Sequence, residues 1–246
     1  MTIEGRKIAI TGAGRSLGAA LAIVAADRGA RPILLGRSAA ALENVASIIE
    51  SRTGARPTTI VCDLADLASI GGAADELLRY HSDLDILVNS GAQWIGGSLV
   101  DLTDTQIAAM VDSMLTGTLA LTRRLLPRLL ARPRADIHTV VSMSGLQYAR
   151  LRGSSLPFRA AKAGQDGFVQ GLVEELAGTN VRVTSVYPGI IEDVLPNELR
   201  WDAELGADGP LTDRQVVEAI LFTLEMPANV AIRSLVIERH RSEFLS

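Results

Sequence analysis

Short apolar runs alternate along the chain with longer segments in which apolar residues recur every three or four positions. The short runs, such as "KIAIT" at 7–11, are rich in β-branched residues, as buried strands are. The longer segments, such as "AAALENVASIIESR" at 39–52, have the spacing of helices that bury one face. Strands that alternate with helices in this way form parallel sheets covered by helices on both faces. We predict strands at 7–11, 31–36, 58–63, 84–92 with its turn, 137–143, 181–189 and 232–238, and helices at 17–28, 39–52, 67–81, 104–131, 158–177 and 212–225.

One segment, 192–211, follows neither period. It contains Pro196, Gly206, Gly209 and Pro210, and it is too long for a simple connection. Segments of this kind are often lids or binding loops. Because no internal repeat or linker interrupts the rest of the chain, we predict one α/β domain over 1–246 with a substrate loop at 192–211.

Composition and charge narrow the class of protein. Hydrophobic residues make up 48% of the 246 residues, which is enough to bury a large core. The net charge is −4 and no long basic run appears, so nucleic acid is not an expected partner. The single cysteine, Cys62, excludes an internal disulfide, and the three histidines lack zinc-site spacing. No apolar run approaches the ~20 residues of a membrane-spanning helix, and the N-terminus lacks a signal-peptide pattern. We therefore predict a cytoplasmic globular protein that binds a small molecule, with no metal and no membrane contact.

A glycine-rich turn, "TGAGRSLG" at 11–18, follows the first predicted strand and opens the first helix. Gly12, Gly14 and Gly18 permit a tight turn, and the backbone N–H groups at a helix N-terminus can hold a pyrophosphate. A turn that only connects a strand to a helix, without binding a phosphate, could have the same glycines. The turn is therefore a moderate signal when it is taken alone.

Six further segments follow the glycine turn along the chain: "CDL" at 62–64, "NSGA" at 89–92, "MLTGT" at 114–118, "VVSMSG" at 140–145, "FRAAKAG" at 158–164 and "YPGIIED" at 187–193. With these segments the chain resembles the short-chain dehydrogenase/reductase family over nearly its whole length. That family's glycine motif is T-G-x-x-x-G-x-G, and Ser16 stands here in place of the middle glycine. The resemblance implies a single-domain Rossmann-type fold, a doubly wound parallel sheet with helices on both faces. All six segments match family motifs and stand in the family's order.

The choice of cofactor is predicted from charge. In the NAD-preferring members of the family an acidic residue follows the second strand, whereas here Gly36 is followed by Arg37. Arg15 lies within the glycine turn, and two guanidinium groups suit a 2′-phosphate, which favours NADP(H). The alternative is that both arginines are ordinary solvated side chains. The resemblance implies these cofactor-binding residues: Gly12, Gly14, Arg15, Ser16, Leu17, Gly18, Arg37, Asp63, Leu64, Asn89, Gly91, Lys162, Pro188, Gly189 and Ile191.

The predicted active site departs from the family pattern of Asn, Ser, Tyr and Lys. Met114 stands at the asparagine position and Phe158 at the tyrosine position, while Lys162 matches. The usual spacing of the serine falls on Gly145, so Ser144 fits after a shift of one residue, and Ser142 is a weaker candidate. Whether Phe158 is natural or engineered stays open, although the second departure at Met114 argues against engineering as the whole explanation.

The phenylalanine matters because it has no proton to transfer. In the family, the resemblance implies, the tyrosine moves the proton and the lysine holds the nicotinamide ribose, while the asparagine supports a water in the proton relay. A positioned general acid contributes roughly 10²–10⁴-fold to a rate. Lys162 could anchor ribose hydroxyls alone or donate the proton itself. Other residues expected near the cleft are the hydroxyl-bearing Tyr148, Ser154, Ser155 and Tyr187, together with Trp94, Trp201 and Asp193, which stands at the family's threonine position near the nicotinamide.

Three functions remain open from the sequence. The first is an NADP(H)-dependent oxidoreductase that acts on a carbonyl/alcohol pair with an incomplete or altered catalytic tetrad. The second is a non-catalytic NADP(H)-binding regulator or partner subunit, and the third is a non-redox enzyme on the same fold. Related proteins pair the helices expected at 104–131 and 158–177 across a two-fold axis, so we also predict a homodimer or homotetramer.

Overall fold

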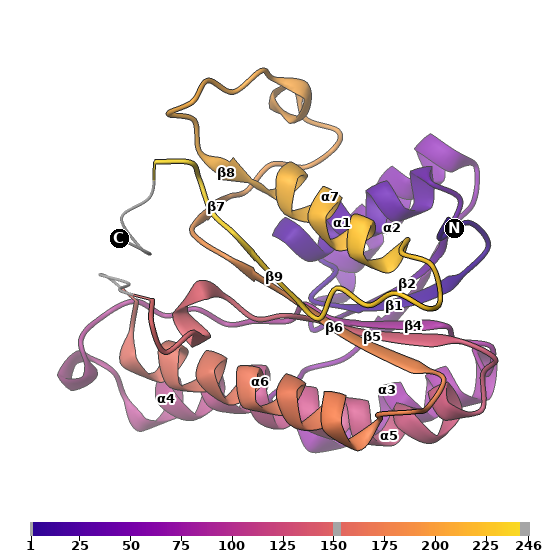
Figure 1. The fold of residues 1–246 in the computed structure, drawn as a ribbon, viewed down its shortest axis with the longest axis horizontal. Helices are drawn as coiled ribbons and strands as arrows, with labels where there is room; N and C mark the ends of the chain where they lie inside the picture. The colour runs from indigo at the N-terminus through magenta and orange to yellow at the C-terminus, as the bar shows by residue number, and fades with distance from the viewer. Residues whose placement is uncertain (1, 150–153, 242–246) are drawn as a thin grey trace.

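A seven-stranded sheet runs through the centre of the molecule (Figure 1). The structure, a computed structural model, describes residues 2–149 and 154–241; the predicted domain bounds 1–246 also take in residue 1, 150–153 and 242–246, which lie outside the described residues. Every neighbouring pair of strands is parallel, in the order β3-β2-β1-β4-β5-β6-β9. The strands are β1 (Lys7–Thr11), β2 (Arg31–Gly36), β3 (Thr58–Val61), β4 (Ile86–Asn89), β5 (Ala135–Val140), β6 (Val181–Pro188) and β9 (Ser234–Ile237).

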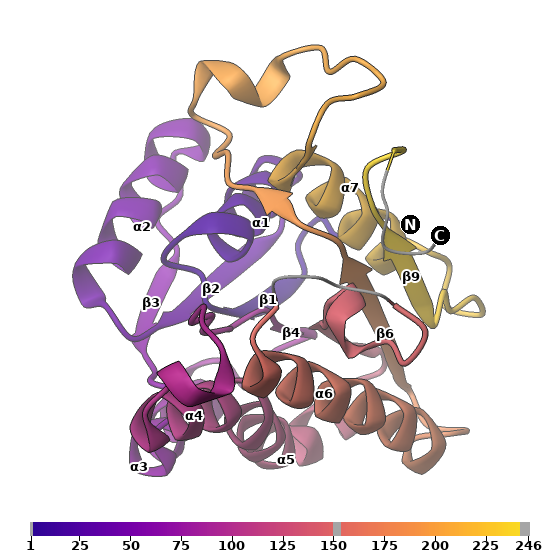
Figure 2. The ribbon, with the colours of Figure 1, turned by 90° about the vertical axis from the view of Figure 1, so that its left-hand side faces the viewer.

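Helices cover both faces of the sheet, so the predicted doubly wound α/β fold is confirmed. Figures 1 and 2 show α1, α2 and α7 on one face and α3, α4, α5 and α6 on the other. The strand order reverses between β1 and β4, and open α/β sheets bind ligands at such a switch point. The helices are α1 (Ser16–Asp27), α2 (Ala39–Thr53), α3 (Leu67–Tyr80), α4 (Asp104–Val111), α5 (Gly117–Leu130), α6 (Leu156–Glu175) and α7 (Asp213–Leu224).

The core explains why α1 is so rich in alanine. All ten residues from Leu17 to Ala26 are buried, because α1 packs against α2 and α7 as well as against the sheet. Small side chains let these elements come close together. The strands β5 and β6 are buried along their whole length, as expected for parallel strands in the middle of a covered sheet.

The helix predicted over 104–131 is interrupted by a π-helical turn at Asp112–Thr116, which separates α4 from α5. Two close approaches surround it. A Cβ atom on Gly117 would lie 2.2 Å from the Leu64 carbonyl oxygen, and one on Gly164 of α6 would lie 2.6 Å from Leu115. The turn therefore packs directly against the segment that follows β3 and against α6. Single π-helical turns of this kind are frequent at functional sites.

The irregular segment 192–211 projects from one end of the molecule, at the top of Figure 1. Two short parallel strands, β7 (Ile191–Glu192) and β8 (Leu211–Thr212), pair at its base. Trp201, in a 3-10 turn at Leu199–Asp202, packs against the core cluster that contains α1 and α7. The segment is thus anchored at its base and at one aromatic ring, and its role in substrate binding stays a prediction.

Candidate cofactor and active site

The glycine turn lets α1 start directly against the loop after β4. A Cβ atom on Gly12, whose φ is +71°, would lie 2.9 Å from the Cα atom of Gly91. A Cβ atom on Gly18 would lie 2.4 Å from the carbonyl oxygen of Gly12. Ser16 also has a positive φ, of 48°, although it is not a glycine. Backbone therefore packs directly against backbone around the N-terminus of α1, at positions where a side chain would clash.

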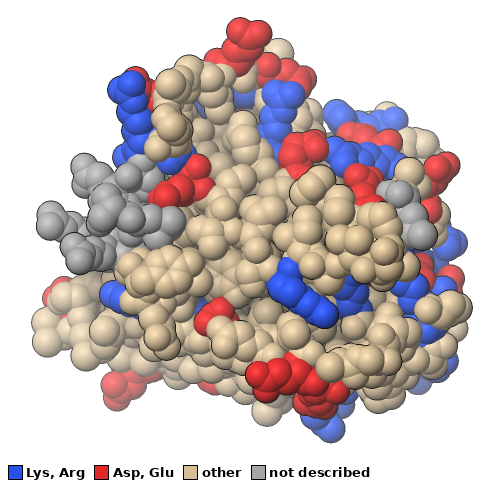
Figure 3. All heavy atoms as spheres, viewed as in Figure 1, with Lys and Arg blue, Asp and Glu red and all other residues tan. Residues whose placement is uncertain are grey.

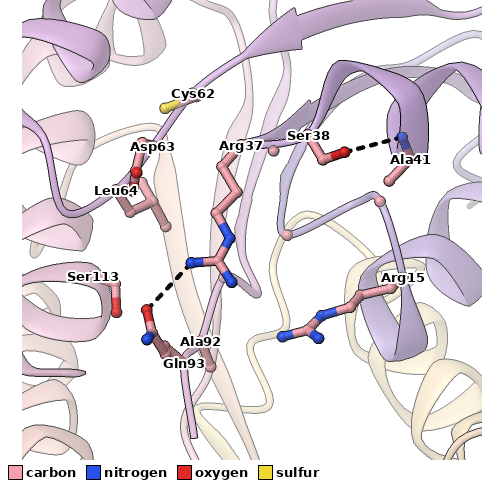
Figure 4. Close-up of a pocket in the computed structure, with 14 residues that line it drawn as sticks. Arg15, Arg37, Ser38, Ala41, Cys62, Asp63, Leu64, Ala92, Gln93 and Ser113 are labelled. Carbon is pink, nitrogen blue, oxygen red and sulfur yellow. Dashed lines mark hydrogen bonds between the residues drawn. The ribbon is translucent and has the colours of Figure 1, made fainter. Parts of the chain in front are cut away.

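A pocket of about 260 Å³ lies beside this turn, at the carboxyl ends of the central strands (Figure 4). The side chains of Arg15 and Arg37 extend into it, and Arg37 Nη1 donates to Gln93 Oε1 at 3.4 Å. Asp63 is the one carboxylate among the described lining residues, and its Oδ1 accepts from the Ala65 N–H at 3.0 Å. The predicted residues that line the pocket are Gly12, Gly14, Arg15, Arg37, Asp63, Leu64 and Gly91.

Other lining residues were not predicted from the sequence, namely Ser38, Ala41, Cys62, Ala92, Gln93 and Ser113. Ser38 had a signal, because a serine before a helical run is a typical N-cap, and it accepts from the Ala41 N–H. Gln93 directly follows the "NSGA" motif. Ser113 had no local signal, since it reaches the pocket only through the position of the π-helical turn. Burial raises the pKa of the Cys62 thiol to about 11, so Cys62 stays a neutral wall of the pocket.

The remaining predicted cofactor residues lie outside this pocket. Asn89 is buried at the end of β4, and its amide donates to Thr122 Oγ1 at 3.3 Å. Ser16 donates from its hydroxyl to Asp193 Oδ2 at 2.9 Å. Pro188 ends β6, and Ile191 opens β7 three residues further along the chain. The others outside the pocket are Leu17, Gly18, Lys162 and Gly189.

Lys162 is buried on α6, with 3% of its surface exposed. Its Nζ donates to the carbonyl oxygen of Val140 and to Gln165 Oε1, each at 2.9 Å. Burial lowers the pKa of this amine to about 7. The Gln165 amide nitrogen donates in turn to the Met114 carbonyl oxygen at 2.7 Å, within the π-helical turn. One side-chain amide therefore links the buried lysine to the backbone of the turn.

Phe158 and Met114 lie in a single apolar cluster. Met114 is fully buried there with Leu102, Met110 and Ala161, and the half-buried Phe158 packs against this group. The Lys162 Nζ lies 5.7 Å from the centre of the Phe158 ring, a cation–π distance. The two side chains share one face of α6, as the i, i+4 spacing predicts.

The candidate hydroxyl groups are scattered. Ser144 is buried in a 3-10 turn after β5, and its Oγ donates to Ser142 Oγ at 2.9 Å. The Tyr187 hydroxyl donates to Asp166 at 2.7 Å, and burial raises the pKa of Tyr187 to about 12. Tyr148 is 65% exposed. Among the described hydroxyl groups, no hydrogen bond joins Ser144, Tyr187 or Tyr148 to Lys162.

The surface does not suggest a nucleic-acid interface. On the face drawn in Figure 3, basic and acidic side chains interleave at the margins, and much of the centre carries neither. A broad basic patch, the usual footprint of nucleic-acid binding, is not seen on this face. Among the helices of the described part of the chain, none is long and apolar enough to cross a membrane.

The fold and the glycine turn define a class, the doubly wound α/β proteins with a phosphate-binding type of turn at the switch point of the sheet. Within that class the chain belongs to the short chain dehydrogenase family, whose profile matches residues 6–203. An uncharacterized oxidoreductase of Staphylococcus saprophyticus is 28% identical over 235 residues, which cover 96% of this chain and 97% of the relative. Another from Staphylococcus aureus is 30% identical over 243 residues, with 96% and 99% covered.

Solved structures share the fold over almost the whole chain. L-sorbose reductase from Gluconobacter frateurii, solved with NADPH and L-sorbose, superposes with a TM-score of 0.85 at 20% identity, and 98% of this chain and 99% of that chain are covered. A metagenomic short-chain oxidoreductase solved with NADP gives a TM-score of 0.78 at 25% identity, with 95% and 97% covered.

Proposed function

We propose that this chain is an NADP(H)-dependent oxidoreductase that acts on a carbonyl/alcohol pair and has an altered proton-transfer group. The observation that carries the proposal is the pair of arginines, Arg15 and Arg37, whose side chains extend into the pocket. Guanidinium groups bind phosphate through paired hydrogen bonds, so they favour a cofactor with a 2′-phosphate. The neighbours solved with NADP and NADPH support the same choice.

The residues of the site fit this cofactor. Gly12 and Gly18 let the backbone of the turn pack tightly against the start of α1 and the loop after β4. Among the described residues no side chain caps α1, so the N–H groups of its first turn are available for a pyrophosphate. Asp63 and Leu64 would contact the adenine end, and Asn89 and Gly91 would support the middle of the dinucleotide. The residues Pro188, Gly189 and Ile191 would border the nicotinamide. When bound, NADP(H) supplies or accepts the hydride.

The proton path is the altered part of the proposal. Phe158 has no hydroxyl, and Ser144 would orient the substrate oxygen without supplying an acid of suitable pKa. Lys162 is the remaining titratable group of the four predicted positions, and its pKa of about 7 suits proton exchange near neutral pH. Two of its N–H bonds are already directed at Val140 and Gln165, which leaves one for a ribose hydroxyl.

A second candidate function is a non-catalytic NADP(H)-binding protein. The observation that favours it is the apolar cluster, in which Phe158 and Met114 pack together where the family places polar groups. A protein with such packing would still bind the cofactor in its groove but would have no polar groups to relay a proton.

Two measurements separate these functions. Titration of the protein with NADPH and NADH, followed by cofactor fluorescence, tests binding and preference. Consumption of NADPH in the presence of a panel of aldehydes and ketones then tests turnover. Binding with turnover supports the oxidoreductase, and tight binding without turnover on any carbonyl supports the second candidate. A protein that binds neither cofactor contradicts both.

A further inference from the structure

A hydrogen bond joins the glycine turn to the segment that follows β7. The Ser16 hydroxyl donates to Asp193 Oδ2 at 2.9 Å, across 177 positions of sequence. Ser16 is the first residue of α1, and this helix lacks both a side-chain cap and an acidic residue in its first turn. A helix N-terminus attracts negative charge. Asp193 therefore brings a carboxylate to the end of the helix that is expected to hold a pyrophosphate.

Asp193 is held in this position by its neighbours along the chain. Glu192, the residue before it, pairs with Thr212 of β8, and the Val194 N–H donates to Asp213 Oδ2 at 3.1 Å. Asp213 is fully buried at the start of α7. Arg200 donates to the Asp193 carbonyl oxygen at 3.4 Å. The backbone on both sides of the carboxylate is thus anchored to the body of the domain.

The charge of Asp193 has no paired cation among residues 2–149 and 154–241. Arg200, the nearest basic residue along the chain, pairs its guanidinium with Glu192 at 2.7 Å instead. The negative charge of Asp193 also acts on Asp213. Burial is the main cause of the raised pKa of Asp213, and repulsion by the Asp193 carboxylate adds to it. An unpaired carboxylate at Ser16 would repel a second anion placed at the same turn.

We propose that Asp193 is an internal competitor of the cofactor and sets its affinity. Its carboxylate holds the Ser16 hydroxyl, and a dinucleotide pyrophosphate bound at the start of α1 replaces that bond and meets the carboxylate's charge. The inference rests on the proposed binding of NADP(H) in this groove. Asp193 then lowers the affinity of the protein for NADP(H). Because Asp193 lies at the base of the 192–211 segment, the position of that segment is coupled to cofactor binding.

The test is the affinity of NADPH for Asp193→Asn, measured by fluorescence titration at low ionic strength. Asparagine keeps the size and an acceptor oxygen but removes the charge, so Kd is expected to fall by roughly 10-fold. Glu192→Gln is the matched control, because it removes the same charge from the adjacent residue, which does not contact Ser16. Its Kd is expected to change by less than about 2-fold, since exposed ion pairs contribute little. An unchanged or weaker affinity in Asp193→Asn overturns the proposal.

A double-mutant comparison tests the contact itself. Ser16→Gly removes the hydroxyl and suits the positive φ at this position. In that background the gain from Asp193→Asn is expected to shrink, because the carboxylate is no longer held at the turn. An equal gain in both backgrounds contradicts a role for the hydrogen bond. If the parent binds NADPH and no variant binds it better, the inference fails and the proposed function stands; if none of the proteins binds NADPH, both fail.

Discussion

Replacing Lys162 with methionine is expected to change how the stability of the protein depends on pH. The ammonium group is buried without a carboxylate partner in the described part of the chain, and its two hydrogen bonds go to neutral oxygen atoms of Val140 and Gln165. Burial therefore lowers the pKa of Lys162 from 10.5 to about 7 in the folded protein. Methionine has a similar length and shape and carries no proton.

The size of the effect follows from proton linkage. Between pH 7 and 10.5 the unfolded chain keeps the Lys162 proton while the folded protein has released it. The free energy of unfolding of the wild type then rises with pH by about 1.36 kcal/mol per unit. Because the folded amine is only half deprotonated at pH 7, the rise between pH 7 and pH 9 is about 2.3 kcal/mol, and Lys162→Met lacks it. Below pH 7 both states hold the proton, so the difference between the two proteins is constant there.

The assay is urea unfolding of both proteins at pH 6, 7, 8 and 9 without cofactor. Loss of the two hydrogen bonds shifts the stability of the variant by an amount that does not depend on pH. The pKa of Asp213, raised by burial to about 7, affects both proteins equally and cancels in the difference. Lys7→Met is the control. Lys7 pairs with Asp83, and the lowered pKa of Asp83 keeps the Asp83 carboxylate ionised over this pH range. A difference between wild type and Lys162→Met that stays constant from pH 6 to 9 refutes the buried, perturbed amine.

Three further predictions concern cofactor, acid and assembly. Arg37→Glu is expected to reverse or abolish a preference for NADPH over NADH, measured by fluorescence titration with Arg31→Glu at the other end of β2 as control; equal affinities in the parent would refute it. Phe158→Tyr is expected to raise NADPH-dependent ketone reduction by up to roughly 10²-fold if the missing acid limits turnover, and no gain while NADPH still binds would point to another defect. Light scattering is expected to report a dimer or tetramer through α5 and α6, where Leu119 is 43% exposed, and a monomer at micromolar concentration would exclude this.

The parts of the fold that local pattern determines could be predicted from the sequence. Each strand of the central sheet was predicted, because buried parallel strands are short apolar runs between turn residues. Seven of the pocket residues were predicted, and that prediction came from the family motifs rather than from the strand pattern. The boundaries were less accurate: the strand expected at 137–143 ends at Val140, because the chain turns into a 3-10 turn at Met143–Gly145.

Features that depend on contacts between distant segments could not be predicted. The π-helical turn lies where Gly117 closely approaches the Leu64 carbonyl. The spacing of apolar residues along a helix does not reveal such a contact with a distant segment. The role of Gln165 was missed for the same reason. Its spacing from Lys162 is that of any helix neighbour, and its bond to the Met114 carbonyl exists only because α6 packs on the turn.

The predicted departures from the family pattern at Met114 and Phe158 are best understood together with Gln165. The Gln165 amide bonds both to Lys162 and to the backbone of Met114, and these are two groups that a water molecule could otherwise bridge. An amide can hold these groups in place, but it does not readily pass a proton between them. A tyrosine at 158 would restore the hydroxyl and leave the amide bridge intact. An asparagine at 114 would also place a polar side chain at a fully buried position beside Leu102 and Met110, at a cost of about 1–3 kcal/mol in stability if it found no partner. The single change at Phe158 is therefore the cleaner measure of the missing acid, because the change at Met114 alters the packing that supports Lys162 as well as the chemistry.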